Sequence, residues 1–154
     1  MSIPSSVSEF LAGKRIAVAG VSRDPRQTAN AIYKKLRDAG YEVVPVNPHA
    51  TEVEGVPCYP DLAAIPGTID GLMVASPPDS ALALVRQCAE RGVKRIWFHR
   101  LVGQGSVAAD AVREARGRGM TCVAGACPFM YVAPIDPFHR CARWLLRWDR
   151  RATG

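Results

Sequence analysis

A glycine and serine turn flanked by arginines is the part of this chain whose residue types most directly suggest chemistry. An apolar run ends at Gly20, the turn continues as Val21-Ser22-Arg23, and a helical pattern opens soon after Arg26. A strand, a tight glycine turn and a helix together offer backbone N–H groups and the positive end of a helix dipole to an anion. The pattern therefore predicts a site for a phosphate-rich ligand, to which the arginines add charge.

The same residues also fit a simpler interpretation, in which Gly20 and Ser22 only make a tight strand-to-helix turn. A dinucleotide-binding fingerprint would have the form G-x-G-x-x-G, with an acidic residue about 20 positions later for the ribose hydroxyls. After Gly20 this chain has no further glycine until Gly40, and its second apolar run ends at Asn47 rather than at a carboxylate. The sequence therefore favours a ligand whose ribose needs no carboxylate over a nicotinamide dinucleotide.

Apolar strand patterns alternate with amphipathic helical patterns along the chain. Strands are expected at 15–20, 41–46, 70–75, 93–98 and 120–124, and helices at 5–12, 28–39, 80–91, 106–116 and 137–150, with one helical turn at 61–65. Repeated strand–helix units predict a doubly wound parallel sheet with right-handed crossovers. Ligands of such sheets lie at the carboxyl ends of the strands. The candidate loops are therefore 21–27, 47–50, 76–79, 99–105 and 125–129.

Composition and charge limit the function classes. A chain of 154 residues fits one domain. No apolar run approaches the roughly 18 residues of a membrane span, and the first residues show no signal-peptide pattern. We therefore expect a cytoplasmic protein with no membrane partner. The formal charge of +6 comes without a helix-turn-helix, zinc or RNP pattern, which favours a small polyanionic ligand over nucleic acid.

The five cysteines are expected to be free thiols. Cys122, Cys127 and His139 match no zinc template, so no metal site is expected.

An ordered set of segments resembles the stand-alone CoA-binding domain family, a Rossmann-like group related to the nucleotide domains of succinyl-CoA synthetase and ADP-forming acyl-CoA ligases. The resemblance runs through 16–25, 40–48, 55–62, 69–78, 92–97 and 126–128, and its most specific piece is the proline-framed Pro45-Val46-Asn47-Pro48. It implies a three-layer α/β fold, with a Rossmann-like doubly wound parallel sheet of about five strands and an additional C-terminal helix. It also implies coenzyme A or an acyl-CoA as the ligand.

The resemblance assigns roles by position. It implies that the CoA pyrophosphate is held by Gly20, Val21 and Ser22, with charge from Arg23 or Arg26. It implies that the adenosine end is framed by Val46, Asn47 and Pro48, and that a further wall is formed by Ser76, Pro77 and Pro78. The family usually shows a glutamine and a nearby glycine after the tryptophan, whereas here Trp97 is followed by Phe98-His99-Arg100. His99 is therefore either a surface residue at a strand end or a ligand contact.

Three segments are expected along the chain: a helical lead-in at 1–13, a CoA-binding Rossmann-like domain at 14–130, and an amphipathic helix with a basic tail at 131–154. The aromatic face of the last helix is expected to pack on the domain or on a partner, which would be a second copy of the chain or another protein.

Catalysis is not expected from these residues. The resemblance implies that the larger relatives carry a phosphohistidine and an ATP-grasp site in further domains, for which this chain is too short. The sequence also contains no recognisable Ser-His-Asp order or paired-carboxylate motif. The main hypothesis is a protein that binds CoA or acyl-CoA without catalysis, and under oxidation a pantetheine thiol near Cys127 would form a mixed disulfide. The alternatives are an NAD(P)-binding oxidoreductase or regulatory subunit, and a protein-interaction subunit without a ligand.

Overall fold

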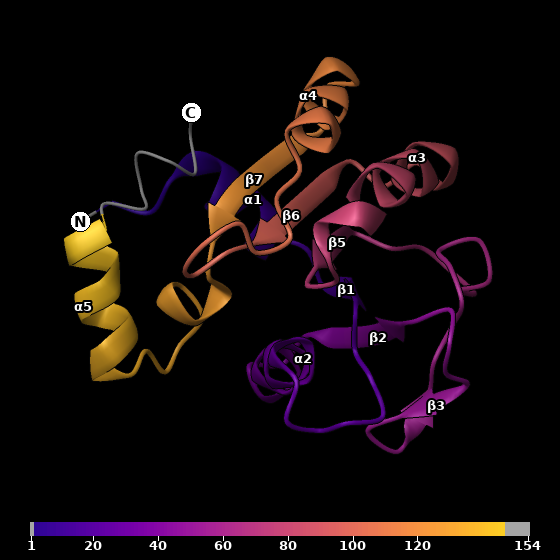
Figure 1. Cartoon of the computed structure of the whole chain (residues 1–154), viewed down its shortest axis with the longest axis horizontal. Helices are drawn as coiled ribbons and strands as arrows, with labels where there is room; N and C mark the ends of the chain where they lie inside the picture. The colour runs from indigo at the N-terminus through magenta and orange to yellow at the C-terminus, as the bar shows by residue number, and fades with distance from the viewer. Residues whose placement is uncertain (1, 147–154) are drawn as a thin grey trace.

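A parallel sheet forms the middle layer of the molecule (Figure 1). The computed structural model describes residues 2–146. The sheet has the order β2-β1-β5-β6-β7, and all four pairings are parallel. Its strands are β1 (Arg15–Ala19), β2 (Glu42–Val46), β5 (Gly71–Val74), β6 (Arg95–His99) and β7 (Thr121–Ala126).

The helices cover both faces of this sheet. They are α1 (Ser5–Leu11), α2 (Thr28–Asp38), α3 (Ala81–Arg91), α4 (Ala109–Gly117) and α5 (Pro137–Leu146), with short 3-10 turns η1 (Pro78–Ser80) and η2 (Pro128–Met130). One hydrophobic cluster joins α1, α2, η2 and α5 to one face of the sheet, and a second joins α3 and α4 to the other. The expected three-layer, doubly wound α/β fold with a C-terminal helix is confirmed. None of the described helices has the length and apolar character that crossing a membrane requires.

Side-chain alternation along the strands explains the two clusters. In β1, Ile16 and Val18 face the layer of α2, while Ala17 and Ala19 face the layer of α3. Because both faces are covered, these strands are continuous apolar runs rather than alternating ones. Trp97 of β6 is fully buried at the centre of the first layer, where its ring meets the Phe10 ring edge-on at 5.3 Å and its indole N–H donates to Ala126 O at 2.8 Å.

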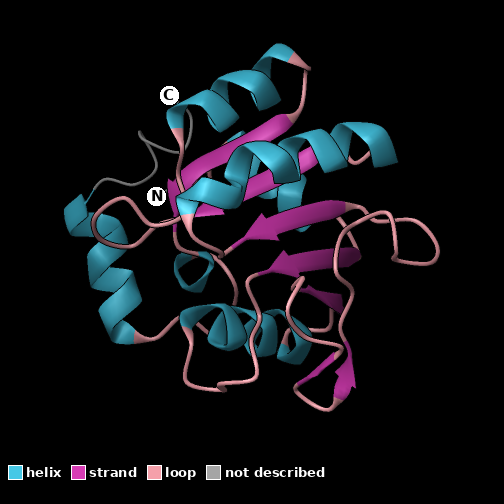
Figure 2. Ribbon diagram, turned by 45° about the vertical axis from the view of Figure 1, so that its right-hand side comes forward, coloured by secondary structure: helices cyan, strands magenta, loops and turns pink. Residues whose placement is uncertain are grey.

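The connection from β2 to β5 contains no helix. It holds a small antiparallel hairpin, β3 (Glu52–Val53) and β4 (Val56–Pro57), which lies beyond the β2 edge of the sheet (Figure 2). The segment 61–65 is a turn rather than a helical element, although the Ala64 N–H donates to the Asp61 carboxylate at 2.9 Å as a capping interaction would.

Two further boundaries differ from the sequence prediction for local reasons. The helix expected from Ser106 begins at Ala109, because Ser106 is buried and its N–H donates to His99 O at 2.8 Å, which ties it to the end of β6. Strand β7 continues to Ala126 through a bulge at Gly125, which has a φ of 90°. A Cβ at this position would lie 2.6 Å from the Arg100 guanidinium.

Helix α5 stands apart from the sheet layer (Figure 1). Ala142 is buried against the first cluster, whereas Phe138, Trp144 and Leu145 are about two-thirds exposed at 65%, 70% and 67%. The expected continuation of this helix over 147–150 lies outside the described residues.

Candidate functional site

The strand order places a topological switch point between β1 and β5. From β1 the chain passes through α2 to β2 on one side, and later enters β5 on the other side of β1. The loops that follow β1 and β5 therefore leave the sheet in opposite directions, and a crevice opens between them at the carboxyl ends of the strands. Gly20 and Ser76 stand at the two sides of this crevice.

Gly20 allows the two strand ends to approach each other. Its φ is 103°, and a Cβ at this position would lie 2.8 Å from Ser76 N and 2.9 Å from the Ala75 carbonyl carbon and oxygen. Its own N–H donates to Val46 O at 3.0 Å. A side chain is therefore excluded by both backbone conformation and close contact.

A cavity of about 680 Å³ occupies the switch point. Its lining comes from the ends of β1, β2 and β5, from the first turns of α3 and from the segment before the 61–65 turn, and carbon atoms form most of it. The lining residues are Ala19, Gly20, Val46, Asn47, Pro48, His49, Pro60, Asp61, Ser76, Pro77, Asp79, Ser80, Ala83, Leu84 and Gln87.

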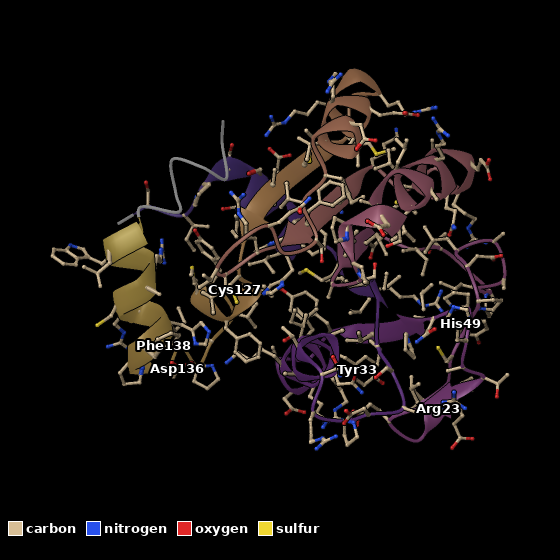
Figure 3. All side chains as sticks on the ribbon, viewed as in Figure 1. Arg23, Tyr33, His49, Cys127, Asp136 and Phe138 are labelled. Atoms are coloured by element: carbon tan, nitrogen blue, oxygen red, sulfur yellow. The ribbon has the colours of Figure 1, made fainter. Side chains whose placement is uncertain are left out.

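A second cavity of about 590 Å³ lies beside the first and shares Pro48, His49 and Pro60 with it. Its remaining lining comes from the turn after β1 and from both flanks of the β3–β4 hairpin: Arg23, Ala50, Thr51, Glu52 and Cys58. Arg23 gives this part of the groove a cationic side chain and His49 adds an imidazole, and Figure 3 shows both beside the hairpin.

The structure brings most of the sequence-predicted site residues to this groove. Those that line the first cavity are Gly20, Val46, Asn47, Pro48, Ser76 and Pro77, and Arg23 lines the second. Val21, Ser22, Arg26 and Pro78 line neither cavity. Val21 is fully buried, and Pro78 begins η1.

Ser22 and Arg26 are engaged within the protein. The Ser22 hydroxyl accepts from Asp24 N–H at 3.1 Å and donates to Asp24 O at 3.2 Å. Arg26 makes a two-contact ion pair with the Asp24 carboxylate at 3.0 and 3.1 Å, which lowers the pKa of that carboxyl. These contacts fold the turn 22–26 onto itself, so Ser22 builds the turn and Arg23 alone extends along the groove.

Sequence reasoning missed Asn30, which holds this turn in place. Asn30 is fully buried on α2, and its Oδ1 accepts from Ser22 N–H at 2.9 Å. Its Nδ2 donates to Ser22 O and to the Glu54 carboxylate, both at 2.8 Å. A polar residue next to the apolar stripe of α2 was the available signal, but its partners could not be read from the sequence.

Asn47 and Gln87 have comparable roles. The Asn47 side chain donates to Val21 O at 3.0 Å and accepts from His49 N–H at 2.8 Å, which joins the loops after β1 and β2. Gln87 Oε1 accepts from Leu62 N–H at 3.1 Å and so holds the 61–65 turn against α3. His49 and Gln87 were not identified from the sequence.

The wall after β5 carries two hydroxyls. Ser80 donates to Pro77 O at 2.8 Å, so Ser76 is the donor in the 2.7 Å contact between the two side chains. Two carboxylates, Asp61 and Asp79, also line the first cavity. As the sequence predicted, no carboxylate follows the end of β2, where Asn47 lies. Asp61 is occupied by the Ala64 N–H, while Asp79 is exposed.

A model of the CoA binding domain family matches residues 14–133 of this chain. The chain belongs to the CoA-binding domain family.

Related proteins agree with this assignment. The chain is 32% identical over 114 residues to the uncharacterized protein YneT of Bacillus subtilis, a match that covers 74% of this chain and 82% of that protein. It is 34% identical over 88 residues to the alpha subunit of an ADP-forming acetate–CoA ligase of Pyrococcus furiosus, where the match covers 56% of this chain but only 19% of the subunit. A hypothetical protein from Pyrococcus horikoshii superposes over 100% of this chain and 99% of its own, with a TM-score of 0.72 and 27% identity.

Two candidate residues from the sequence, His99 and Cys127, lie away from the groove. His99 ends β6 and is half-buried, and burial together with the nearby His139 lowers its pKa to about 4. Cys127 is buried, which raises the pKa of its thiol to about 11. Neither residue lines the two cavities, and Figure 3 places Cys127 well apart from Arg23 and His49. The thiol beside the groove is Cys58. In residues 2–146, no group of three His, Cys, Asp or Glu side chains is placed to hold a metal ion.

Replacing Gly20 tests the close approach of the two strand ends. Gly20→Ala is expected to lower the free energy of unfolding by at least about 2 kcal/mol more than Gly40→Ala, measured by urea titration. Gly40 is a matched control, because its φ of 97° is similar to the 103° of Gly20 but a Cβ there would meet nothing within 4 Å. Equal losses in the two variants would contradict the proposed contact.

The buried imidazole of His99 predicts a pH dependence. Because its pKa falls from 6.5 to about 4 in the folded state, the unfolded state binds the proton more readily. Stability is therefore full above pH 6.5 and is lost progressively as the pH falls toward 4, by up to about 1.4 kcal/mol per pH unit. His99→Asn, which cannot ionise, is expected to flatten this part of the curve in urea titrations at several pH values. An unchanged curve would contradict the burial of a neutral imidazole.

Proposed function

We propose that this protein binds coenzyme A or an acyl-CoA, without catalysis, in the groove at the carboxyl ends of β1, β2 and β5. The observation that carries the proposal is the cavity of about 680 Å³ at the switch point, which is lined by the same three loops through which the chain resembles its family. Its size lies within the range of small-molecule sites.

The two cavities suit the two chemical characters of CoA. The first has a mainly apolar lining with hydroxyls at one wall, which suits an adenine ring or a pantetheine arm. The second has Arg23 and His49, which suit phosphate groups. We infer that Gly20-Val21-Ser22 contributes by its shape, since the N–H groups of Gly20 and Ser22 already donate to Val46 O and Asn30 Oδ1.

The proposal of binding without catalysis rests on the extent of the similarity. The P. furiosus ligase subunit is matched over only 19% of its length, so its activity does not follow from the resemblance. A cytoplasmic location is supported by the five free thiols, since disulfides are rare in reducing compartments.

Calorimetry with CoA, acetyl-CoA, NAD and NADP tests the proposal. We expect CoA or acetyl-CoA to bind at least about tenfold more tightly than NAD or NADP. The reason is that β2 is followed by Asn47, whose amide contacts Val21 O and His49 N–H, rather than by a carboxylate that would chelate a ribose diol. A preference for NAD with no CoA binding would defeat the proposal and would point to Asp61 or Asp79 as the ribose partner.

Arg23→Gln tests the location within the same titrations. Removal of a charge-assisted contact is expected to weaken CoA binding by about tenfold or more. Arg118→Gln is the control, because Arg118 pairs with Glu114 on α4 at 2.9 Å and lines neither cavity. If both variants bind CoA like the unmodified protein, the second cavity is not part of the site.

We also propose that α5 contacts a second copy of the chain, as a second role beside ligand binding. The observation that favours it is the exposure of Phe138, Trp144 and Leu145 on one helix of ten residues. The mass measured by light scattering is expected to be that of a dimer and to fall to that of a monomer in the double variant Phe138→Ser, Trp144→Ser. A monomeric unmodified protein would contradict this role and leave the ligand site untouched.

A further inference from the structure

The side chain of Asn30 is fully buried and makes three hydrogen bonds, which use both hydrogens of its amide group. Its Oδ1 takes the Ser22 N–H at 2.9 Å, and its Nδ2 gives one hydrogen to Ser22 O and one to Glu54 Oε1, each at 2.8 Å. The orientation of the amide is fixed by chemistry, because Ser22 O and a carboxylate can only accept and Ser22 N–H can only donate. Asn30 therefore joins the turn after β1 to the β3–β4 hairpin.

Glu54 reaches Asn30 from an unfavourable backbone conformation. Within residues 2–146 it is the one non-glycine residue with a positive φ, 51°, and with Gly55 at 74° it makes the tight turn of the hairpin. Asparagine, aspartate or glycine would suit that turn better than glutamate. The carboxylate is only 12% exposed and also contacts Lys34 Nζ at 3.4 Å. Since turn geometry does not favour glutamate here, the side-chain contacts with α2 are what hold it.

The two segments that Asn30 joins form opposite sides of the second cavity. Arg23 follows Ser22 directly and lines one side, while Glu52 and Cys58 come from the flanks of the hairpin that carries Glu54. The buried amide of Asn30 therefore contacts both of the segments that contribute to this cavity. Asn30 itself lines neither cavity, so any effect it has on a ligand must pass through Ser22 and Glu54.

We propose that Asn30 is a positioning residue of the ligand site, and that its contact with Glu54 couples the hairpin to the turn that carries Arg23. The second cavity is then a preformed part of the site that receives the anionic end of the ligand. This inference rests on the proposed function for its ligand, but the coupling between turn and hairpin is a property of the free protein.

A swap of donor and acceptor tests the coupling. Asn30→Asp places a second carboxylate against Glu54, so two acceptors face each other and like charges repel. Glu54→Gln alone keeps an oxygen that can accept from Asn30. In the double variant Asn30→Asp, Glu54→Gln, the new amide donates to the new carboxylate, and a hydrogen bond between α2 and the hairpin is restored with the direction reversed. The comparison of the four proteins is a double-mutant cycle.

Calorimetry with CoA gives the first measurement. We expect Asn30→Asp to weaken binding by about tenfold or more and Glu54→Gln to stay within about threefold. The double variant is expected to recover part of the loss, because it restores the contact between residues 30 and 54 but not the donation from residue 30 to Ser22 O. A double variant no tighter than Asn30→Asp would overturn the coupling, and an Asn30→Asp protein that binds normally would overturn the positioning role. Should Asn30→Asp not fold, Glu54→Ala replaces it, because it frees the hairpin but leaves the Asn30–Ser22 contacts. It is then expected to weaken binding by about fivefold, and normal binding would overturn the proposal.

Hydrogen exchange in the free proteins gives the second measurement and separates this inference from the proposed function. Faster exchange is expected in Asn30→Asp at residues 21–24 and 52–57, with no change in β6 at any point. The double variant is expected to regain slow exchange at 52–57, where the contact with residue 54 is restored. If the unmodified protein does not bind CoA but shows this pattern, the proposed ligand is wrong and the coupling stands. Acceleration throughout the sheet, without rescue, would mean that Asn30 is only a core residue.

Discussion

The whole arrangement depends on the contact between the Gly20 backbone and the backbone of Ala75 and Ser76. A Cβ on Gly20 would lie 2.8 to 2.9 Å from three of these atoms. Since no side chain separates them, β1 and β5 remain side by side to their last residues, and the N–H of Ala75 donates to Ala19 O at 3.0 Å. The loops must diverge immediately beyond this point, and their divergence opens the crevice.

Three amide side chains then fix the shape of the crevice. Asn30 joins the first loop to the hairpin, Asn47 joins the first loop to the second, and Gln87 holds the 61–65 turn on α3. Asn30 is fully buried, whereas Asn47 and Gln87 are partly exposed, and each of these amides imposes geometry without adding charge. The Arg23 guanidinium and the His49 imidazole lie at the groove surface, where a polyanion can meet them.

The general fold could be predicted because the signal is local. A continuous apolar strand such as Arg15–Ala19, and the glycine that ends it, can be recognised from adjacent residues alone. The run is continuous because helices cover both faces of the sheet, so both faces carry apolar side chains. The loops at the carboxyl ends followed from that order. The hairpin could not be predicted, since it has only two residue pairs and its turn is Glu54-Gly55 rather than a favourable Asn-Gly. Asn30 was missed for a related reason: its partner Glu54 lies 24 positions away.

The most direct measurement is a crystal structure of the protein with CoA. We predict that the ligand lies across the carboxyl ends of β1, β2 and β5, with phosphate oxygens near Arg23 and His49 and an apolar part in the first cavity against Gly20 and Ser76. A nucleotide found instead beside His99 and Cys127, with the switch-point crevice empty, would contradict it.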